Sequence, residues 1–289
     1  MEEDHLNLLR TAFNAYLLRL GSALEPNDPY LPYEYDYIAK AKWRPFIDAM
    51  LQDELREVTN QLHQWRDMLR SWHAWNEVAS TYEEQEAWTL RREFMEPLMH
   101  SCLLAPSSFR DLLTFVGTNA MHQLRLHTES GYIDRMQGDP NPSDPKPRPL
   151  TRRKKEERLF TMLAPITASG PFTSALRRLD DVDYREQTKD YRNSNSHAIG
   201  PRIAVGITKM VTRIVVPATE MQWQPDGTGR IVTVPGRFVP SYTFGGLEPL
   251  DPESARRANL LQYARARDCF GHLTELISSL ASTLPRADA

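Results

Sequence analysis

The sequence predicts an all-α protein, a helical bundle with one β-hairpin, at about residues 203–235, inserted before the final helix. Glycine is scarce in the first 130 residues, where only Gly21 and Gly117 occur, and this favours uninterrupted helices. Apolar residues there recur at steps of three and four, the period of a helix with one buried face. By contrast, β-branched residues gather in 203–216 and 230–235, on either side of the sequence PDGTG, which predicts two strands joined by a turn.

The first predicted helix covers about residues 6–20, and its apolar stripe is expected to be buried. The stripe consists of Leu6, Leu9, Phe13, Leu17 and Leu20. A loop with prolines at positions 26, 29 and 32 follows it.

A longer helix is predicted over 44–78, because its apolar residues alternate steps of four and three. These residues are Leu51, Leu55, Val58, Leu62, Trp65, Leu69 and Trp72. A period of 3.5 residues is typical of a coiled-coil seam, which packs on another helix of this chain or of a second copy. Two further helices are predicted over about 84–104 and 107–128, the second beginning after Pro106.

A proline-rich segment, 137–150, is predicted to be an extended linker or an exposed loop. Its prolines, at 140, 142, 145, 147 and 149, prevent both helix and strand pairing. It separates an N-terminal helical part, 1–136, from a C-terminal helical part, 151–289, and we expect the two parts to form one continuous bundle. The basic start of the next helix, 151–158, is either a solvated face or a phosphate-binding patch, and the first interpretation is favoured.

The final helix is predicted to begin at Asp251–Ser254, where a proline stands in the first turn. Its apolar residues available for burial are Leu260, Leu261, Tyr263, Phe270, Leu273, Leu276 and Ile277.

Charge and composition exclude several classes of protein. The 289 residues carry 35 Lys and Arg against 38 Asp and Glu, a formal charge of -3, which argues against a broad basic surface for nucleic acid. No apolar run reaches the roughly 18 residues that a membrane helix needs, and the acidic first residues do not resemble a signal peptide. Cys102 and Cys269 are too few for a disulfide framework, so we expect buried thiols and a cytoplasmic location.

The candidate for chemistry lies in a short helix predicted over about 184–198, with Asp183 and Glu186 as a capping pair. Its last turns carry Arg192, Asn193, Asn195 and His197. On an ideal helix Arg192 and His197 differ by about 140° around the axis and about 7.5 Å along it. The long Arg192 side chain is expected to bend back toward the imidazole.

These residue types suit transesterification at an RNA phosphate. A histidine can take the proton from a ribose 2′-hydroxyl, and an arginine can stabilise the charge that develops on the phosphoryl oxygens. Such a site needs no metal and no cofactor.

The segment from Arg192 to His197, Arg-Asn followed by three residues and His, resembles the signature of the HEPN (higher eukaryotes and prokaryotes nucleotide-binding) superfamily. The resemblance implies an all-α fold, a homodimer with two motifs in one cleft, and a metal-independent endoribonuclease that serves as a toxin or in anti-phage defence. It also implies catalytic roles for Arg192 and His197, with Asn193 in support. Tyr191, Asn195 and Arg202 are the candidate substrate-binding residues. The implied partners are RNA and an antitoxin or regulatory protein, without a membrane.

Spacing alone would not carry this prediction, because five Arg–His pairs in the chain are separated by four to six residues. The asparagine directly after Arg192 makes the match specific. A different interpretation of His197 stays open: a histidine at a helix end, which contributes only to stability. The alternative function is a non-catalytic HEPN-like module that binds a nucleotide or a protein.

Other candidates are weaker. His122 with His127, and His100 with Cys102, do not have the spacing of a recognised zinc site. Asp180, Asp181 and Asp183 could bind a metal, yet near a helix start they more simply complement the helix dipole.

Overall fold

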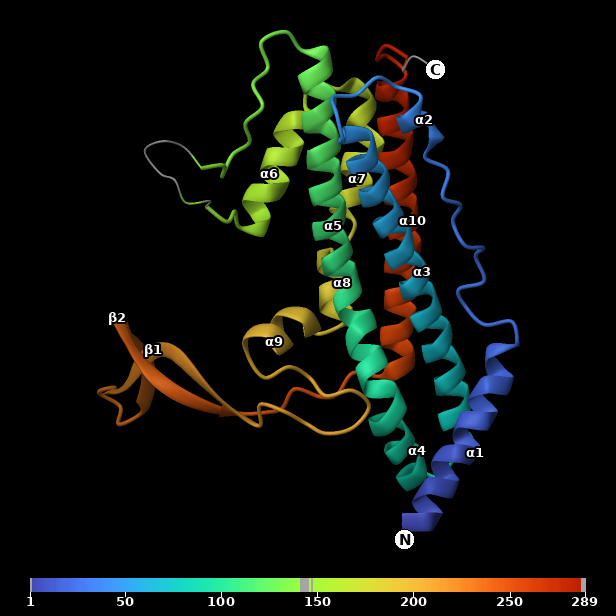
Figure 1. Cartoon of the computed structure of the whole chain (residues 1–289). Helices are drawn as coiled ribbons and strands as arrows, with labels where there is room; N and C mark the ends of the chain where they lie inside the picture. The colour runs from blue at the N-terminus through green and yellow to red at the C-terminus, as the bar shows by residue number, and fades with distance from the viewer. Residues whose placement is uncertain (1, 141–145, 147, 287–289) are drawn as a thin grey trace. The chain divides into compact units, whose positions relative to one another are not determined.

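Helices dominate the computed structural model, which describes residues 2–140, 146 and 148–286 (Figure 1). The α-helices are α1 (Glu2–Leu20), α2 (Asp36–Ala39), α3 (Ile47–Ala79), α4 (Glu84–Leu90), α5 (Glu96–Thr128), α6 (Arg152–Leu163), α7 (Gly170–Arg177), α8 (Val182–Gln187), α9 (Tyr191–His197) and α10 (Pro252–Ala281). A π-helical turn, Arg91–Met95, joins α4 to α5, and a 3₁₀ turn, Thr167–Ser169, precedes α7. Within the proline-rich segment, residues 141–145 and 147 lie outside the described residues.

The strands of the described residues form one antiparallel hairpin, β1 (Val211–Trp223) and β2 (Gly229–Phe244), which precedes α10 and confirms the predicted fold class. The turn lies where the glycines predicted it, but the strands do not. Residues 203–210 form only isolated bridges, and β2 continues nine residues beyond the predicted end at 235. Pro235 and Pro240 do not stop β2, because a two-stranded sheet leaves each strand an open edge where no N–H is needed.

The two faces of the hairpin differ in exposure. On one face all eight residues of four cross-strand pairs are exposed: Val211–Phe244, Arg213–Tyr242, Val215–Pro240 and Pro217–Phe238. On the other face, Ile214, Val216 and Val239 are only half-exposed.

The long helices α3, α5 and α10 lie side by side and enclose the core (Figure 1). The predicted stripe of α3, from Leu51 to Trp72, is buried throughout, so its seam packs within this chain. At the centre the Trp65 ring lies 5.5 Å from Phe109 of α5 and 5.7 Å from Tyr263 of α10, measured between ring centroids. The tryptophan N–H is satisfied as well, since it donates to Asn259 Oδ1 at 2.7 Å.

Helix α5 corrects one predicted boundary. The sequence predicted separate helices divided at Pro106, yet α5 runs from Glu96 to Thr128 with Pro106 inside it. A proline cannot donate to the carbonyl four residues earlier, here that of Cys102. The structure supplies another donor, because Asn259 Nδ2 of α10 lies 2.6 Å from the Cys102 carbonyl oxygen.

Helix α1 forms as predicted, but much of its apolar stripe is not buried. Leu6, Phe13 and Leu17 are exposed, whereas Ala12 is fully buried. The contact with α3 runs along a different edge, where the Tyr16 ring stacks on Trp75 at 4.5 Å between centroids. The stripe therefore lies beside this contact rather than in it.

The chain divides into two compact units. The first, here called the helical unit, comprises Met1–Thr188 and Pro252–Ala289, and the second, the hairpin unit, comprises Lys189–Asp251. Among the described residues, no helix has both the length and the apolar character needed to cross a membrane.

Candidate functional site

The segment predicted as one helix over 184–198 forms two helices instead, α8 and α9. Lys189 and Asp190 separate them with φ angles of 51° and 50°, in the left-handed region where an α-helix cannot continue. The run from Gln187 to Asn195 contains Thr, Asp, Ser and two Asn residues, which have low helix propensity. A break in the helix therefore costs little free energy here.

The predicted capping pair at the start of α8 is also wrong. Asp181, rather than Asp183, caps this helix, and its Oδ1 accepts a hydrogen bond from the backbone N–H of Tyr184 at 3.0 Å.

Backbone strain concentrates around α9. Of the six non-glycine residues with positive φ among the described residues, four lie in the hairpin unit: Lys189, Asp190, Ala204 and Lys209. Such conformations cost about 1–3 kcal/mol each and cluster at functional sites. Lys189 is held by its amine, which donates to the carbonyl oxygens of Glu248 at 3.0 Å and Pro249 at 3.2 Å.

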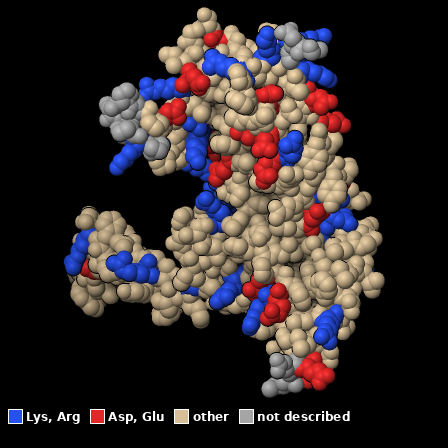
Figure 2. Space-filling view, in the orientation of Figure 1, with Lys and Arg blue, Asp and Glu red and all other residues tan. Residues whose placement is uncertain are grey.

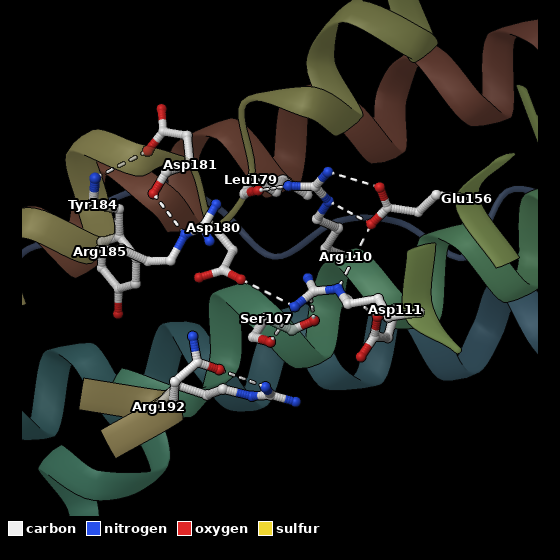
Figure 3. Close-up of polar contacts among 12 residues, drawn as sticks. Ser107, Arg110, Asp111, Glu156, Leu179, Asp180, Asp181, Tyr184, Arg185 and Arg192 are labelled. Carbon is white, nitrogen blue, oxygen red and sulfur yellow. Dashed lines mark hydrogen bonds and ion pairs between the residues drawn. The ribbon is translucent and has the colours of Figure 1, made fainter. Parts of the chain in front are cut away.

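Arg192 is oriented by a short relay of polar side chains at the start of α9, and Figure 3 shows its side chain with the first contact of the relay. Its Nη1 donates to Asn193 Oδ1 at 2.8 Å, and Asn193 Nδ2 donates to Asp190 Oδ1, also at 2.8 Å. The amide thus accepts from the arginine and donates to the carboxylate. Because Asn193 is neutral, the guanidinium keeps its full charge available for an anion.

His197 ends α9 and is exposed. Within the described part of the chain, neither a hydrogen bond nor an ion pair engages its imidazole, and none joins it to Arg192. Both ring nitrogens are therefore accessible to a ligand. The sequence predicts that the Arg192 guanidinium bends back toward this imidazole. In the structure it contacts Asn193 instead.

The three candidate substrate-binding residues have different surroundings. Tyr191 is buried, whereas Arg202 is exposed. Asn195 donates from Nδ2 to the Tyr191 carbonyl at 3.0 Å and lies so close to Gly200 that a Cβ there would overlap its amide. Gly200 thus gives Asn195 its place at the end of α9.

Asp190 is a functional candidate that sequence reasoning missed. Its spacing of three residues before Asn193 is the available signal, because side chains three apart on one helix face can meet. The left-handed backbone of Asp190 and its acceptor role for Asn193 then follow only from the structure.

The basic segment 151–158 begins α6 with Thr151 as its cap. Its leading arginine belongs to an ion-pair network, of which Figure 3 labels Arg110, Glu156 and Asp180. Arg152 contacts Asp111 at 2.9 Å and the buried Asp180 at 3.1 Å. Arg110 makes a two-pronged pair with Glu156, both nitrogen–oxygen distances being 2.8 Å. Acidic partners inside the helical unit, rather than phosphate, therefore engage Arg152.

Several of the weaker candidates make contacts of this kind. Asp181 pairs with Arg265 at 2.7 Å. His122 is buried between the Tyr132 hydroxyl and Asp134, each at 2.9 Å. His127 Nε2 accepts from the backbone N–H of Arg44. Over the residues that the structure describes, no group of three or more His, Cys, Asp or Glu is arranged to hold a metal ion.

No family model, no curated protein and no solved structure matches this chain. The resemblance to the HEPN superfamily thus rests on the Arg192–His197 motif and stays a prediction.

Proposed function

We propose that this chain is a metal-independent endoribonuclease of the HEPN type, with Arg192 and His197 as its catalytic residues. One observation carries the proposal: Asp190 and Asn193 hold the Arg192 guanidinium in place, while the His197 imidazole on the same helix is exposed and unengaged. A purely structural helix end needs neither an oriented arginine nor a solvent-accessible histidine.

The reaction follows from these two groups. The neutral imidazole of His197 removes the proton from a ribose 2′-hydroxyl, and the 2′-oxygen attacks the adjacent phosphorus. The bond from phosphorus to the 5′-oxygen breaks, and that oxygen takes up a proton from the imidazolium form of His197, which then acts as the general acid. Arg192 stabilises the negative charge on the non-bridging oxygens during the transfer. The products are a 2′,3′-cyclic phosphate and a 5′-hydroxyl.

The position of the two residues on α9 favours a homodimer as the active form. Five residues of an ideal helix place Arg192 and His197 about 140° apart, on different sides of the axis. Two copies of α9 brought together around one phosphate would combine the arginine of one copy with the histidine of the other.

The test is incubation of purified protein with RNA in excess EDTA. We expect cleavage that leaves 2′,3′-cyclic phosphate ends, and His197→Ala should slow it by about 100-fold or more, the range for loss of a general base. His5→Ala, an exposed histidine in α1, is the matched control and should cleave like the wild type. Intact RNA across substrates of varied sequence and structure would reject the proposal.

The alternative function, a module that binds a nucleotide or a protein without cleaving RNA, predicts a different outcome. Under it, the double variant Arg192→Ala with His197→Ala would retain its partner, and the wild type would leave RNA intact. Roles as a toxin or in anti-phage defence, held in check by an antitoxin or regulatory partner in the cytoplasm, belong to the nuclease proposal. They would appear as growth arrest that requires His197.

A further inference from the structure

The exposed face of the hairpin is unusually aromatic for a surface in contact with water. Phe238, Tyr242 and Phe244 are 64%, 63% and 86% exposed, and they alternate with other residues along β2, so all three point to one side. Together with Pro240 between them and the four β1 residues paired with these positions, they form what is here called the aromatic face. In the described part of the hairpin unit, no other segment covers it.

The charge of this face is positive. Arg213 lies directly opposite Tyr242, and no acidic residue belongs to the four cross-strand pairs of the aromatic face. The hairpin unit as a whole carries seven Lys and Arg against five Asp and Glu, a charge of +2 in a chain whose total is -3. Figure 2 shows basic side chains on the visible side of the hairpin, with little acidic surface.

We propose that the aromatic face binds single-stranded RNA, and that unpaired bases stack on Phe238, Tyr242 and Phe244 while Arg213 contacts the backbone phosphate. Every base has a flat π-face, so rows of exposed aromatics with nearby arginine bind single strands with little sequence preference. The inference builds on the proposed nuclease, since it names single-stranded RNA as the substrate class, but it concerns a separate surface with its own measurement.

A second copy of the chain is a less suitable occupant. Face-to-face packing of two aromatic faces would place Arg213 of each copy in an apolar interface with no acidic partner on either face. Burying an unpaired charge is costly, and buried charges in proteins are normally paired. An RNA strand brings the missing negative charge together with apolar base surfaces.

The base of the hairpin is tied to both ends of α9 within the same unit. At the start of the helix, Lys189 donates to the carbonyls of Glu248 and Pro249, which follow β2. Beyond its end, the Thr208 hydroxyl donates to the Gly200 carbonyl at 3.0 Å, just before β1. These ties would hold a strand bound on the aromatic face in a defined relation to the motif.

Binding is measured on the full-length His197→Ala protein, so that cleavage does not interfere. The probe is a fluorescent, non-self-complementary RNA of about 15 nucleotides, followed by anisotropy. Tyr242→Leu and Phe244→Leu should each weaken binding about five- to 150-fold, the effect of losing one stacked base. Tyr242→Phe keeps the ring and should bind within about twofold of the parent. Arg213→Gln should lower the slope of log affinity against log salt by about 0.7.

Several outcomes would overturn the inference. It fails if the parent does not bind the single strand, if duplex RNA of the same sequence binds as tightly, or if Tyr242→Leu binds like Tyr242→Phe. It also fails if leucine variants turn a dimer into a monomer in sedimentation while RNA affinity is unchanged, because the occupant would then be a second copy. If the wild type binds the RNA but does not cleave it, the nuclease proposal alone is rejected. If the leucine variants cleave RNA as fast as the wild type, RNA binding at the aromatic face alone is rejected.

Discussion

Asn259 of α10 donates from Nδ2 to the carbonyl oxygen of Cys102 in α5, at 2.6 Å and across 157 residues of sequence. This is the carbonyl that Pro106 leaves without its helical partner. Asn259 is fully buried, and the same amide also donates to the Tyr184 hydroxyl at 2.9 Å, while its Oδ1 accepts from Trp65. One side chain thus joins α3, α5, α8 and α10.

Removing this amide should destabilise the helical unit strongly. Asn259→Leu leaves the Cys102 carbonyl and the Trp65 N–H buried without partners, at about 1–3 kcal/mol for each group. We expect a loss of about 3 kcal/mol in the free energy of unfolding, measured by urea denaturation. The exposed Leu261, two residues further along α10, provides the control, since Leu261→Ala should change stability by less than about 0.5 kcal/mol. Equal effects of the two variants would contradict a special role for Asn259.

The same contact explains why the sequence predicted some boundaries and missed others. Periodicity identified α3 and α10 because a buried stripe of one helix is a local pattern. The continuity of α5 through Pro106 depends on a donor 157 residues away, which no local pattern contains. Likewise the local motif predicts Arg192 and His197 as site residues. The role of Asp190 and the break between α8 and α9 depend on left-handed backbone conformations at positions 189 and 190, and the contacts of Lys189 with Glu248 and Pro249 lie about 60 residues away in sequence.

Asn193 should act as a positioning residue for Arg192. Asn193→Ala releases the guanidinium, and we expect kcat for RNA cleavage to fall about tenfold with little change in KM, because an oriented charge matters most in the transition state. Asn193→Asp retains an oxygen that accepts from Arg192, and should recover part of this loss. Circular dichroism and the unfolding midpoint should not distinguish the two variants from Ser196→Ala, the control. Equal kcat for the alanine and aspartate variants would argue against positioning.

Stability should fall in acid because of Glu253. Hydrogen bonds from Arg256, Asn76 and Arg257 lower the pKa of this carboxyl to about 2. The pKa in the folded state lies below the unfolded value of about 4.3, so the ionised carboxylate stabilises the fold above about pH 4.3. This stabilisation is lost as the pH falls from about 4.3 toward 2. Because the side chain is 38% exposed, solvent screening limits the effect to about 1 kcal/mol.

The measurement for Glu253 compares unfolding by urea at pH 6 and pH 3. Glu253→Gln should be less stable than the wild type by about 1 kcal/mol at pH 6. The difference should shrink at pH 3, because the carboxyl of the unfolded wild type, with a pKa of about 4.3, is protonated at that pH. A difference that stays constant between the two pH values would show that the charge of Glu253 is not the stabilising feature.

The two cysteines should react only when the protein unfolds. Cys102 and Cys269 are both free and fully buried, which confirms the prediction of buried thiols, and burial raises the pKa of Cys269 to about 12 and that of Cys102 further. Because the thiolate is the reactive form, both burial and the raised pKa slow alkylation. Iodoacetamide should modify each cysteine roughly a thousandfold more slowly, or slower still, in buffer than in urea, with the reaction followed by mass spectrometry.

Asn259→Leu should accelerate labelling of both cysteines, since it lowers the free energy of the opening that exposes them. Fast modification of either cysteine in the native wild type would mean that the packing around it opens locally rather than with the whole helical unit.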